Sequence, residues 1–239
     1  MVERALKVNF PGLSETLEAD DLSEVEDALL RKTVLEYLSA GNSFLRETFQ
    51  LHMDNIISAA GIAKQRFNAG FKGMLASDSD VGVQLIRPGH ILRDTTAAET
   101  PINGWRSSLV ASGAFTTSTD YWIGYGTNNT TALNVSQYLL MLVVGFQFLQ
   151  GNAPTVEELL LTVGNTNFPA IVLRQAWIAD NVNRVRAVRV PPILVTPRQT
   201  VLGQVYSTDG GLQELAVLGL SFGPGRYLRR QTYAAADLP

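Results

Sequence analysis

The chain has 239 residues, 46% of them hydrophobic, which is enough to bury a sizeable core in one all-β domain. It has no cysteine, so disulfides, thiolate zinc sites and cysteine nucleophiles are excluded. Its formal net charge of -3 is distributed unevenly, because residues 1–100 carry 10 basic and 15 acidic side chains whereas residues 101–239 carry 9 and 7, and those 9 are all arginine.

The first helix is predicted near the start of the chain. Ser23 and Glu26 fit the S-x-x-E capping box that begins a helix, and Gly41 is placed to end it. Residues spaced three or four apart form one face of this helix: Leu22, Val25, Leu29, Thr33 and Tyr37. The acidic cluster around its start is either a docking patch for a basic partner or a solvated helix end with favourable dipole placement, and we favour the second interpretation.

A second helix is predicted directly after the first, with Asn42 or Ser43 as its cap. Its apolar face consists of Leu45, Phe49, Met53, Ile56, Ala60 and Ala63. We therefore expect residues 1–75 to form a two-helix N-terminal arm. The arm can pack on itself, on the rest of the chain or on a neighbouring subunit, and the sequence leaves these three open. On the third alternative, Leu45 and Phe49 are candidate interface residues.

The remainder, residues 76–239, alternates in the manner of β-strands cut by Gly, Pro and Asn. The segment 138–149 is apolar on both strand faces, so it is predicted to be central or to lie under the arm. Other strands are predicted at 83–86, 105–115, 121–125, 156–163, 170–178, 185–190, 201–207 and 212–222. Thr208-Asp209-Gly210-Gly211 is the strongest hairpin signal. About eight strands predict a mainly β fold, an antiparallel sandwich of jelly-roll type.

The segment 116–136 is rich in Thr, Asn, Ser and Gly, with aromatic residues set among them. We expect an exposed loop or loose hairpin. Amphipathic aromatics within small polar residues also build binding loops for sugars or protein partners. Tyr121, Trp122 and Tyr125 are therefore candidate interface residues.

Several catalytic patterns fail on context. Residues 219–223 match the G-x-S-x-G nucleophile elbow, but this motif needs a strand-to-helix turn with a later His, and His52 and His90 both lie upstream. Ser221 instead continues a strand. Glu157 and Glu158 point to opposite faces of a strand and cannot flank one glycosidic bond. Without a metal cluster or a nucleotide fingerprint, we expect no cofactor and no enzymatic activity.

The C-terminal arginines are the remaining candidates. Arg226, Arg229 and Arg230 follow a Gly-Pro-Gly turn and are expected on a tail with Tyr227 and Tyr233. Basic residues among aromatics suit single-stranded nucleic acid. A pI near 5.4 disfavours that partner, so ion pairs to the acidic arm of the same or a neighbouring chain are the preferred hypothesis.

An all-β domain with a helical arm and arginine-only basic charge resembles the virion structural proteins of phages and other viruses, especially jelly-roll capsid and cement subunits. The resemblance is architectural. It implies a non-enzymatic subunit of a virion, a cement or tail component among the alternatives, whose partners are copies of itself and other proteins of the same particle. Nucleic acid is not expected, nor is a membrane, since the longest apolar run has 12 residues and the first ten residues lack a signal-peptide core. The alternative is a carbohydrate- or receptor-binding β module that uses the 116–136 loop, with a glycan as its ligand.

Overall fold

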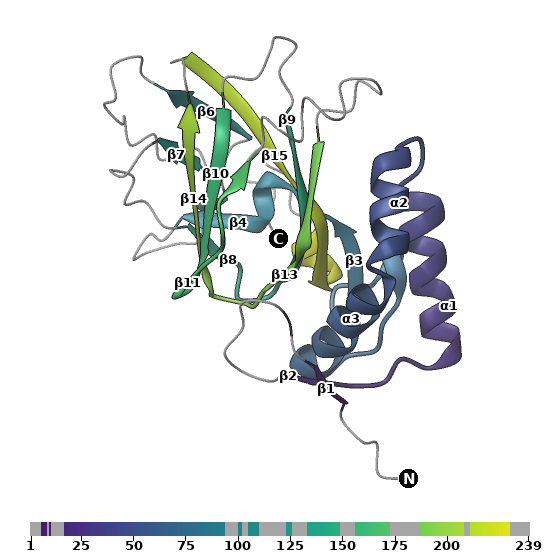
Figure 1. Ribbon diagram of the computed structural model, residues 1–239. Coiled ribbons are helices and arrows are strands. Elements are labelled where there is room, and N and C mark those ends of the chain that lie inside the picture. Colours follow the sequence, from purple (N-terminus) through teal and green to yellow (C-terminus); the bar gives the residue numbers. More distant parts are fainter. Residues whose placement is uncertain are drawn as a thin grey trace.

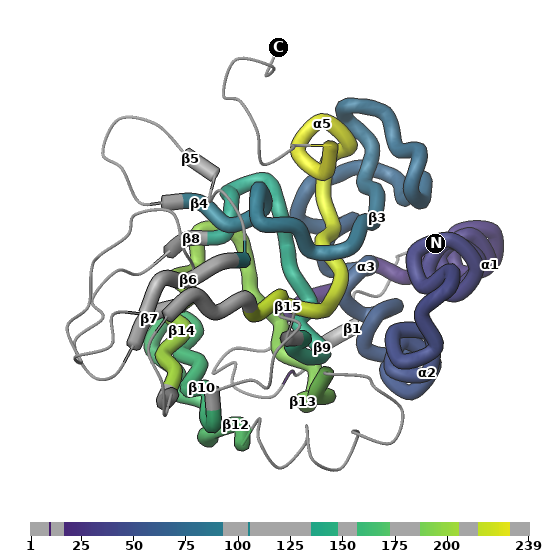
Figure 2. The backbone as a smooth tube through the Cα atoms, turned by 90° about the horizontal axis from the view of Figure 1, so that it is seen from above, coloured from purple at the N-terminus to yellow at the C-terminus, as the bar shows by residue number. Residues whose placement is uncertain are grey.

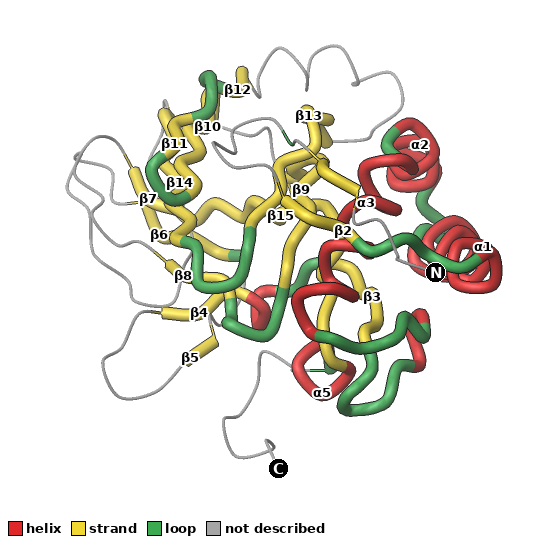
Figure 3. Tube along the Cα trace, turned by 90° about the horizontal axis from the view of Figure 1, so that it is seen from below, coloured by secondary structure: helices red, strands yellow, loops and turns green. Residues whose placement is uncertain are grey.

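The chain folds into three layers, a helical layer, a central sheet and an outer sheet (Figure 1). The structure is a computed structural model, and the residues it describes are 6–8, 10, 17–93, 100–101, 105–109, 123–125, 133–148, 156–172, 187–207 and 211–229. The helices gather along one side of the strands in the views from above and from below (Figures 2 and 3). The predicted mainly β sandwich with N-terminal helices is confirmed.

The helical layer begins as the sequence predicts. Ser23 caps the first helix with a complete capping box, and Asn42 caps the second by accepting a hydrogen bond from the Leu45 N–H at 3.0 Å. The second helix breaks at His52, so it forms two helices rather than one. The helical elements of this layer are α1 (Glu24–Lys32), the π-helix η1 (Thr33–Leu38), α2 (Ser43–Leu51), α3 (Met53–Phe67) and the 3-10 turn η2 (Gly73–Leu75).

A carboxylate ties this layer together. Glu26 accepts hydrogen bonds from Lys64 Nζ of α3 at 2.8 Å, from the Phe71 N–H at 2.9 Å and from the Ser23 N–H at 3.0 Å. Burial opposes ionisation of this carboxyl, but the hydrogen bonds from Lys64, Ser23 and Phe71 outweigh it, and the pKa of Glu26 falls from 4.5 to about 2. One side chain thus joins the start of α1 to α3 and to the segment that leads to the first long strand.

A short strand pair, β1 (Leu6–Val8) and β2 (Leu17–Ala19), lies at the start of the chain. The Asp20 N–H, directly after β2, donates to the Gly61 carbonyl of α3 at 3.2 Å. Gly61 lies inside a helix, where glycine costs stability relative to alanine. A Cβ at this position would collide with the Asp20 carbonyl oxygen, which explains the glycine.

The central sheet has the strand order β13-β9-β15-β3, with β6 paired to the other end of β15. Its strands are β3 (Val81–Leu85), β6 (Arg106–Leu109), β9 (Leu140–Phe148), β13 (Ala187–Val195) and β15 (Gly211–Pro224). As predicted for 138–149, strand β9 is apolar on both faces. Leu140, Leu142 and Val144 face the helices, while Met141 and Val143 face the outer sheet.

Strict alternation along β9 would place Phe146 on the same face as Leu140, Leu142 and Val144, but the structure differs. The register with β15 shifts between Leu218 and Gly219, so Val144 is an extra residue in β9. This bulge moves Phe146 to the face that meets the outer sheet.

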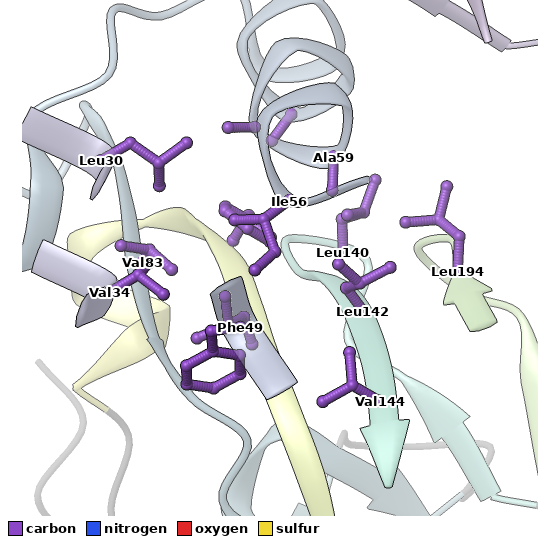
Figure 4. Packing of buried hydrophobic residues seen from close by; sticks show 14 of the residues in the cluster. Leu30, Val34, Phe49, Ile56, Ala59, Val83, Leu140, Leu142, Val144 and Leu194 are labelled. Carbon is purple, nitrogen blue, oxygen red and sulfur yellow. The ribbon is translucent and has the colours of Figure 1, made fainter. Parts of the chain in front are cut away.

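Helices α2 and α3 place their apolar face on the central sheet (Figure 4). All six residues predicted for this face are buried, and Phe49, Ile56, Ala60 and Ala63 are 0% exposed. Burial of a side chain the size of Phe49 contributes about 1.5–3 kcal/mol, so this interface is a large part of the core. The arm therefore shares one continuous apolar core with the β strands.

The outer sheet has the order β11-β10-β14-β8-β4-β5, with β12 paired to β10 and β7 to β14. Its strands are β4 (Ile91–Arg93), β5 (Thr100–Pro101), β7 (Ile123–Tyr125), β8 (Leu133–Val135), β10 (Val156–Val163), β11 (Thr166–Asn167), β12 (Ile171–Val172) and β14 (Thr200–Ser207). Strand pairing in both sheets is antiparallel except between β7 and β14, which run parallel. A second core fills the space between the sheets, with Leu159, Leu161 and Val205 from the outer sheet.

The hairpin predicted at 208–211 is wrong. Strand β14 belongs to the outer sheet and β15 to the central sheet, and the described residues of each pair with other strands. Between β14 and β15 the chain therefore passes from the outer sheet to the central sheet, because burial of both faces of β15 overrides the local turn preference.

Strand β13 also differs from its prediction, because it continues through Pro191 and Pro192 to Val195. It is an edge strand of the central sheet, and its register with β9 shifts between Arg189 and Ile193. Proline lacks an N–H to donate and is tolerated at edges and bulges. Arg189 fastens this edge to α2, because its Nε donates to Thr48 Oγ1 at 2.8 Å and its Nη2 pairs with Glu47 at 2.7 Å.

Replacing Glu26 with Gln removes the charge that Lys64 and two backbone N–H groups stabilise. We expect the free energy of unfolding to fall by about 2 kcal/mol at pH 7. Because the pKa of the folded state is depressed, the wild-type advantage is fully present above pH 4.5 and is lost as the pH falls toward 2. Urea titrations at several pH values measure it. Glu24→Gln, exposed in the same helical turn, is the control and should cost less than about 1 kcal/mol; equal losses in the two variants would contradict this role of Glu26.

Candidate interaction surface

Two of the predicted interface residues lie inside the chain. Leu45 is 5% exposed and Phe49 is 0% exposed, because α2 lays both on the central sheet. As surface offered to a partner, this pair is therefore a wrong prediction. An apolar helix face has the same pattern whether its own sheet or a neighbouring subunit covers it, so the sequence carried no signal to separate the two.

The outer row of α1 is the part of the arm that its own chain leaves uncovered. Leu30 of α1 and Val34 of η1 are completely buried. Val25 of α1, by contrast, is 76% exposed and Tyr37 of η1 is 54% exposed. Both exposed residues belong to the face predicted from the 22–37 spacing. The packed face is rotated by about one residue from it, since Thr33 and Val34 are buried together.

Apolar side chains of η2 extend this exposed surface. Gly73 packs against α1, where a Cβ would meet Leu29 Cγ at 3.2 Å and Thr33 Oγ1 at 3.0 Å. Glycine suits the position because its φ is +66°. The next residues, Met74 and Leu75, point outward and Leu75 is 88% exposed. We call Val25, Tyr37, Met74 and Leu75 the outer helical surface.

A second surface feature combines two half-buried tyrosines and an arginine. The rings of Tyr138 and Tyr227 stack with centroids 3.9 Å apart and planes 9° apart. The Arg226 guanidinium carbon lies 4.7 Å from the Tyr227 ring centroid and 5.8 Å from that of Tyr138. Arg226 itself is exposed. Stacking on a ring fixes the plane of a guanidinium while its N–H groups stay available in that plane.

Arg198 lies beside this stack at a turn between β13 and β14. Its guanidinium donates to the side-chain oxygen of Gln137, the residue before Tyr138, and its N–H donates to the Val135 carbonyl at 3.0 Å. The chain crosses between the two sheets at both turns, so they meet at one end of the sandwich. We call Gln137, Tyr138, Arg198, Arg226 and Tyr227 the arginine platform.

Arg226 and Arg229 do not lie on a tail as predicted. After Pro224 the chain forms the short helix α5 (Gly225–Leu228), which Leu228 anchors in the core between the sheets at 2% exposure. Arg229 forms its ion pair with Asp78 of the same chain and donates to the Ala76 carbonyl at 2.9 Å. We predicted from the sequence that Arg229 and Arg230 contact carboxylates across a subunit boundary. For Arg229 the contact is instead made within the chain; Arg230 lies outside the described residues.

The aromatic candidates of the 116–136 segment fall mostly outside the described residues, including Tyr121 and Trp122. Tyr125 belongs to strand β7, opposite Val205 of β14, within the strand predicted at 121–125. The pairing of β7 with β14 was not predictable from residues 116–136, because the partner strand is far away in the sequence.

The structure joins His90 and Ser221, which the sequence analysis kept apart. His90 Nδ1 lies 2.9 Å from Ser221 Oγ and 3.3 Å from the Arg87 N, whose N–H it accepts, and His90 Nε2 lies 3.3 Å from the Leu228 carbonyl oxygen. A serine hydrogen-bonded to a histidine is the first element of a nucleophilic site. Both side chains are 0% exposed, so this pair fastens η3 (Pro88–His90), β15 and α5 together.

The carboxylates of Asp78 and Asp80, in the bend before β3, are engaged by protein groups. Asp80 accepts from Ser77 Oγ at 2.7 Å, and Asp78 pairs with Arg229. Within the residues that the structure describes, no group of three or more His, Asp or Glu side chains could hold a metal ion. None of the helices described is long and apolar enough to cross a membrane.

Comparison with known proteins gives no family. No family model and no curated protein matches the sequence. Among solved structures, a GH26-CBM35 β-(1,4)-mannanase from Podospora anserina matches with a TM-score of 0.23 and 10% sequence identity. The match covers 59% of this chain and 27% of the mannanase chain. A similarity at this level carries no argument about fold or function.

Replacing Ser221 with Ala tests its structural role. We expect the free energy of unfolding to fall by about 1 kcal/mol, because a buried hydrogen bond to His90 is lost. Ser79→Ala, in an exposed bend, is the control and should have little effect. Chemical denaturation measures both variants. Covalent labelling of Ser221 in the native wild-type protein by a serine-directed phosphonate would contradict a purely structural role.

Proposed function

We propose that the chain is a non-enzymatic structural subunit of a symmetric assembly, in the class of viral capsid, cement or tail components, and that it acts through protein–protein contacts. The observation that carries this proposal is the outer helical surface. Its exposed apolar side chains remain uncovered although the chain has two well-filled cores elsewhere.

The distribution of exposed apolar residues supports an interaction role for this surface. Most large apolar residues exposed in the described part of the chain belong to the helical layer, namely Val25, Tyr37, Leu51, Met74 and Leu75. Leu160 and Val172, on the outer sheet, complete the set. Single exposed apolar residues are normal, but their concentration on one layer indicates a contact surface.

The position of α1 within the arm also supports an assembly role. Helices α2 and α3 hold α1 on the periphery, where it is the outermost helix in Figure 1. The ion pair between Glu26 and Lys64 fixes α1 in place. A fixed helix loses little conformational entropy when a partner covers it, which favours binding.

We propose a symmetric assembly because contacts between copies of one chain usually close into a symmetric oligomer. The virion class rests on the architectural resemblance, a β sandwich with helices at its N-terminal side. We place the chain among the structural proteins of such particles rather than among their enzymes.

The double variant Val25→Glu with Leu75→Glu tests the proposal. We expect wild-type protein to form a discrete oligomer above the 26.0 kDa monomer. The variant should shift toward monomer, because two charges would have to be desolvated in the contact. Light scattering after size-exclusion chromatography measures the mass at several concentrations.

Leu160→Glu is the matched control, because Leu160 is 46% exposed on the outer sheet, away from the helices. Its assembly should equal that of the wild type. Circular dichroism verifies that all three proteins are folded. A wild-type protein that stays monomeric at every concentration would refute the assembly role, and a double variant that assembles normally would refute the role of this surface.

A further inference from the structure

We infer that the arginine platform binds the acidic first turn of helix α1 from a second copy of this chain, in a head-to-tail contact. This inference rests on the proposed function and names the partner surfaces that it leaves open. Its two halves are Arg198 and Arg226 on one copy, and on the next copy Glu24 of that turn together with Asp21, two residues before the Ser23 cap.

Two tyrosine rings hold the Arg226 guanidinium, which forms no ion pair with a carboxylate of the described residues. The other described arginines with resolved ion pairs use carboxylates of their own chain: Arg31 with Asp27, Arg189 with Glu47, Arg229 with Asp78. Within the described residues Arg226 makes none, and the tyrosine stack holds its guanidinium in place at the surface. A guanidinium presented in this way donates two parallel hydrogen bonds to a carboxylate without first losing rotamer freedom.

Arg198 gives an independent reason to expect a ligand here. Its φ of +65° lies in the left-handed region, which favours glycine or asparagine. The Gln199 N–H donates to the Thr196 carbonyl at 3.1 Å, so Pro197 and Arg198 occupy the centre of a tight turn. Glycine would adopt this φ with less strain than arginine. The presence of an arginine therefore indicates that its side chain has a binding role. Its contact with Gln137 directs the Arg198 side chain toward the turn that carries Tyr138, whose ring Arg226 also contacts.

The complementary acidic groups lie at the start of α1. Asp21 and Glu24 are exposed and form no ion pair among the described residues, whereas the nearby Glu26 and Asp27 are engaged by Lys64 and Arg31. Val25, directly after Glu24, is 76% exposed and offers an apolar group to the tyrosine rings. The first turn of a helix also carries N–H groups without intrahelical acceptors, and these can donate hydrogen bonds to hydroxyl oxygens of the second copy.

The contact cannot form within one copy, because α1 and α5 lie apart on the periphery with β3 between them (Figures 2 and 3). Two different surfaces that meet between copies produce a heterologous interface, which closes into a ring when the rotation permits. The overall charge of -3 and the segregation of acidic residues into the first 100 favour this protein partner over nucleic acid.

Charge reversal on each side tests the inference with the full chain. Arg226→Glu alone, and Asp21→Arg with Glu24→Arg in one chain, should each raise the dissociation constant between copies by at least about tenfold, because like charges then face each other. An equimolar mixture of these two variants should assemble into mixed dimers, since the reversed platform meets the reversed helix. Sedimentation velocity and native mass spectrometry measure the species.

Arg87→Glu is the matched control, because Arg87 is exposed and, like Arg226, has no ion pair in the described part of the chain. It should assemble as the wild type does. Fluorescence anisotropy with a labelled single-stranded oligonucleotide is measured in parallel on wild type and Arg226→Glu.

The possible outcomes distinguish failure of the proposed assembly role from failure of the inferred contact. A monomeric wild type refutes the proposed function itself. A wild-type oligomer that Arg226→Glu leaves intact, or that the mixture of reversed variants does not restore, overturns this inference while the assembly role stands. Oligonucleotide binding that Arg226→Glu abolishes would assign the platform to nucleic acid instead.

Discussion

The structure depends on a central sheet that must be covered on both faces. Strand β9 presents Leu140 and Leu142 to one side and Met141 and Val143 to the other, and all four are nearly or fully buried. Neither face is stable in water, so one requires the helical layer and the other the outer sheet. The helices are therefore part of the fold rather than an appendage, and their apolar face is unavailable to partners.

This constraint decides which surfaces remain for function. The chain crosses repeatedly between the two sheets, and the crossings bring polar and aromatic groups together at the ends of the sandwich, as at Tyr138 and Tyr227. The helical layer has only its outer side left, where Val25 and Leu75 are exposed. Buried polar groups such as His90 and Ser221 satisfy one another inside. The outer helical surface and the arginine platform thus result from the way in which the helices and the outer sheet cover the central sheet.

Much of the fold follows from local sequence signals. The capping box at Ser23, the cap at Asn42 and the two-sided apolar run of β9 were predictable, since each depends on residues close in the chain. The hairpin at 208–211 was not, because a turn sequence has the same composition whether the strands pair or cross between sheets. The arginine platform was also beyond sequence reasoning, since Tyr138 and Tyr227 meet only through the packing of α5. The predicted interface at Leu45 and Phe49 failed because periodicity cannot identify which surface covers a helix.

Hydrogen–deuterium exchange compared between dilute and assembled full-length protein tests the account most directly. The Ser23 side chain caps the Glu26 N–H, whereas the Glu24 and Val25 N–H groups have no intrahelical acceptors, so a covering neighbour should slow their exchange measurably. The account predicts added protection at residues 20–27 together with residues 136–138 and 225–229 on assembly. Protection gained only on the outer sheet, at β10 and β12, would contradict it.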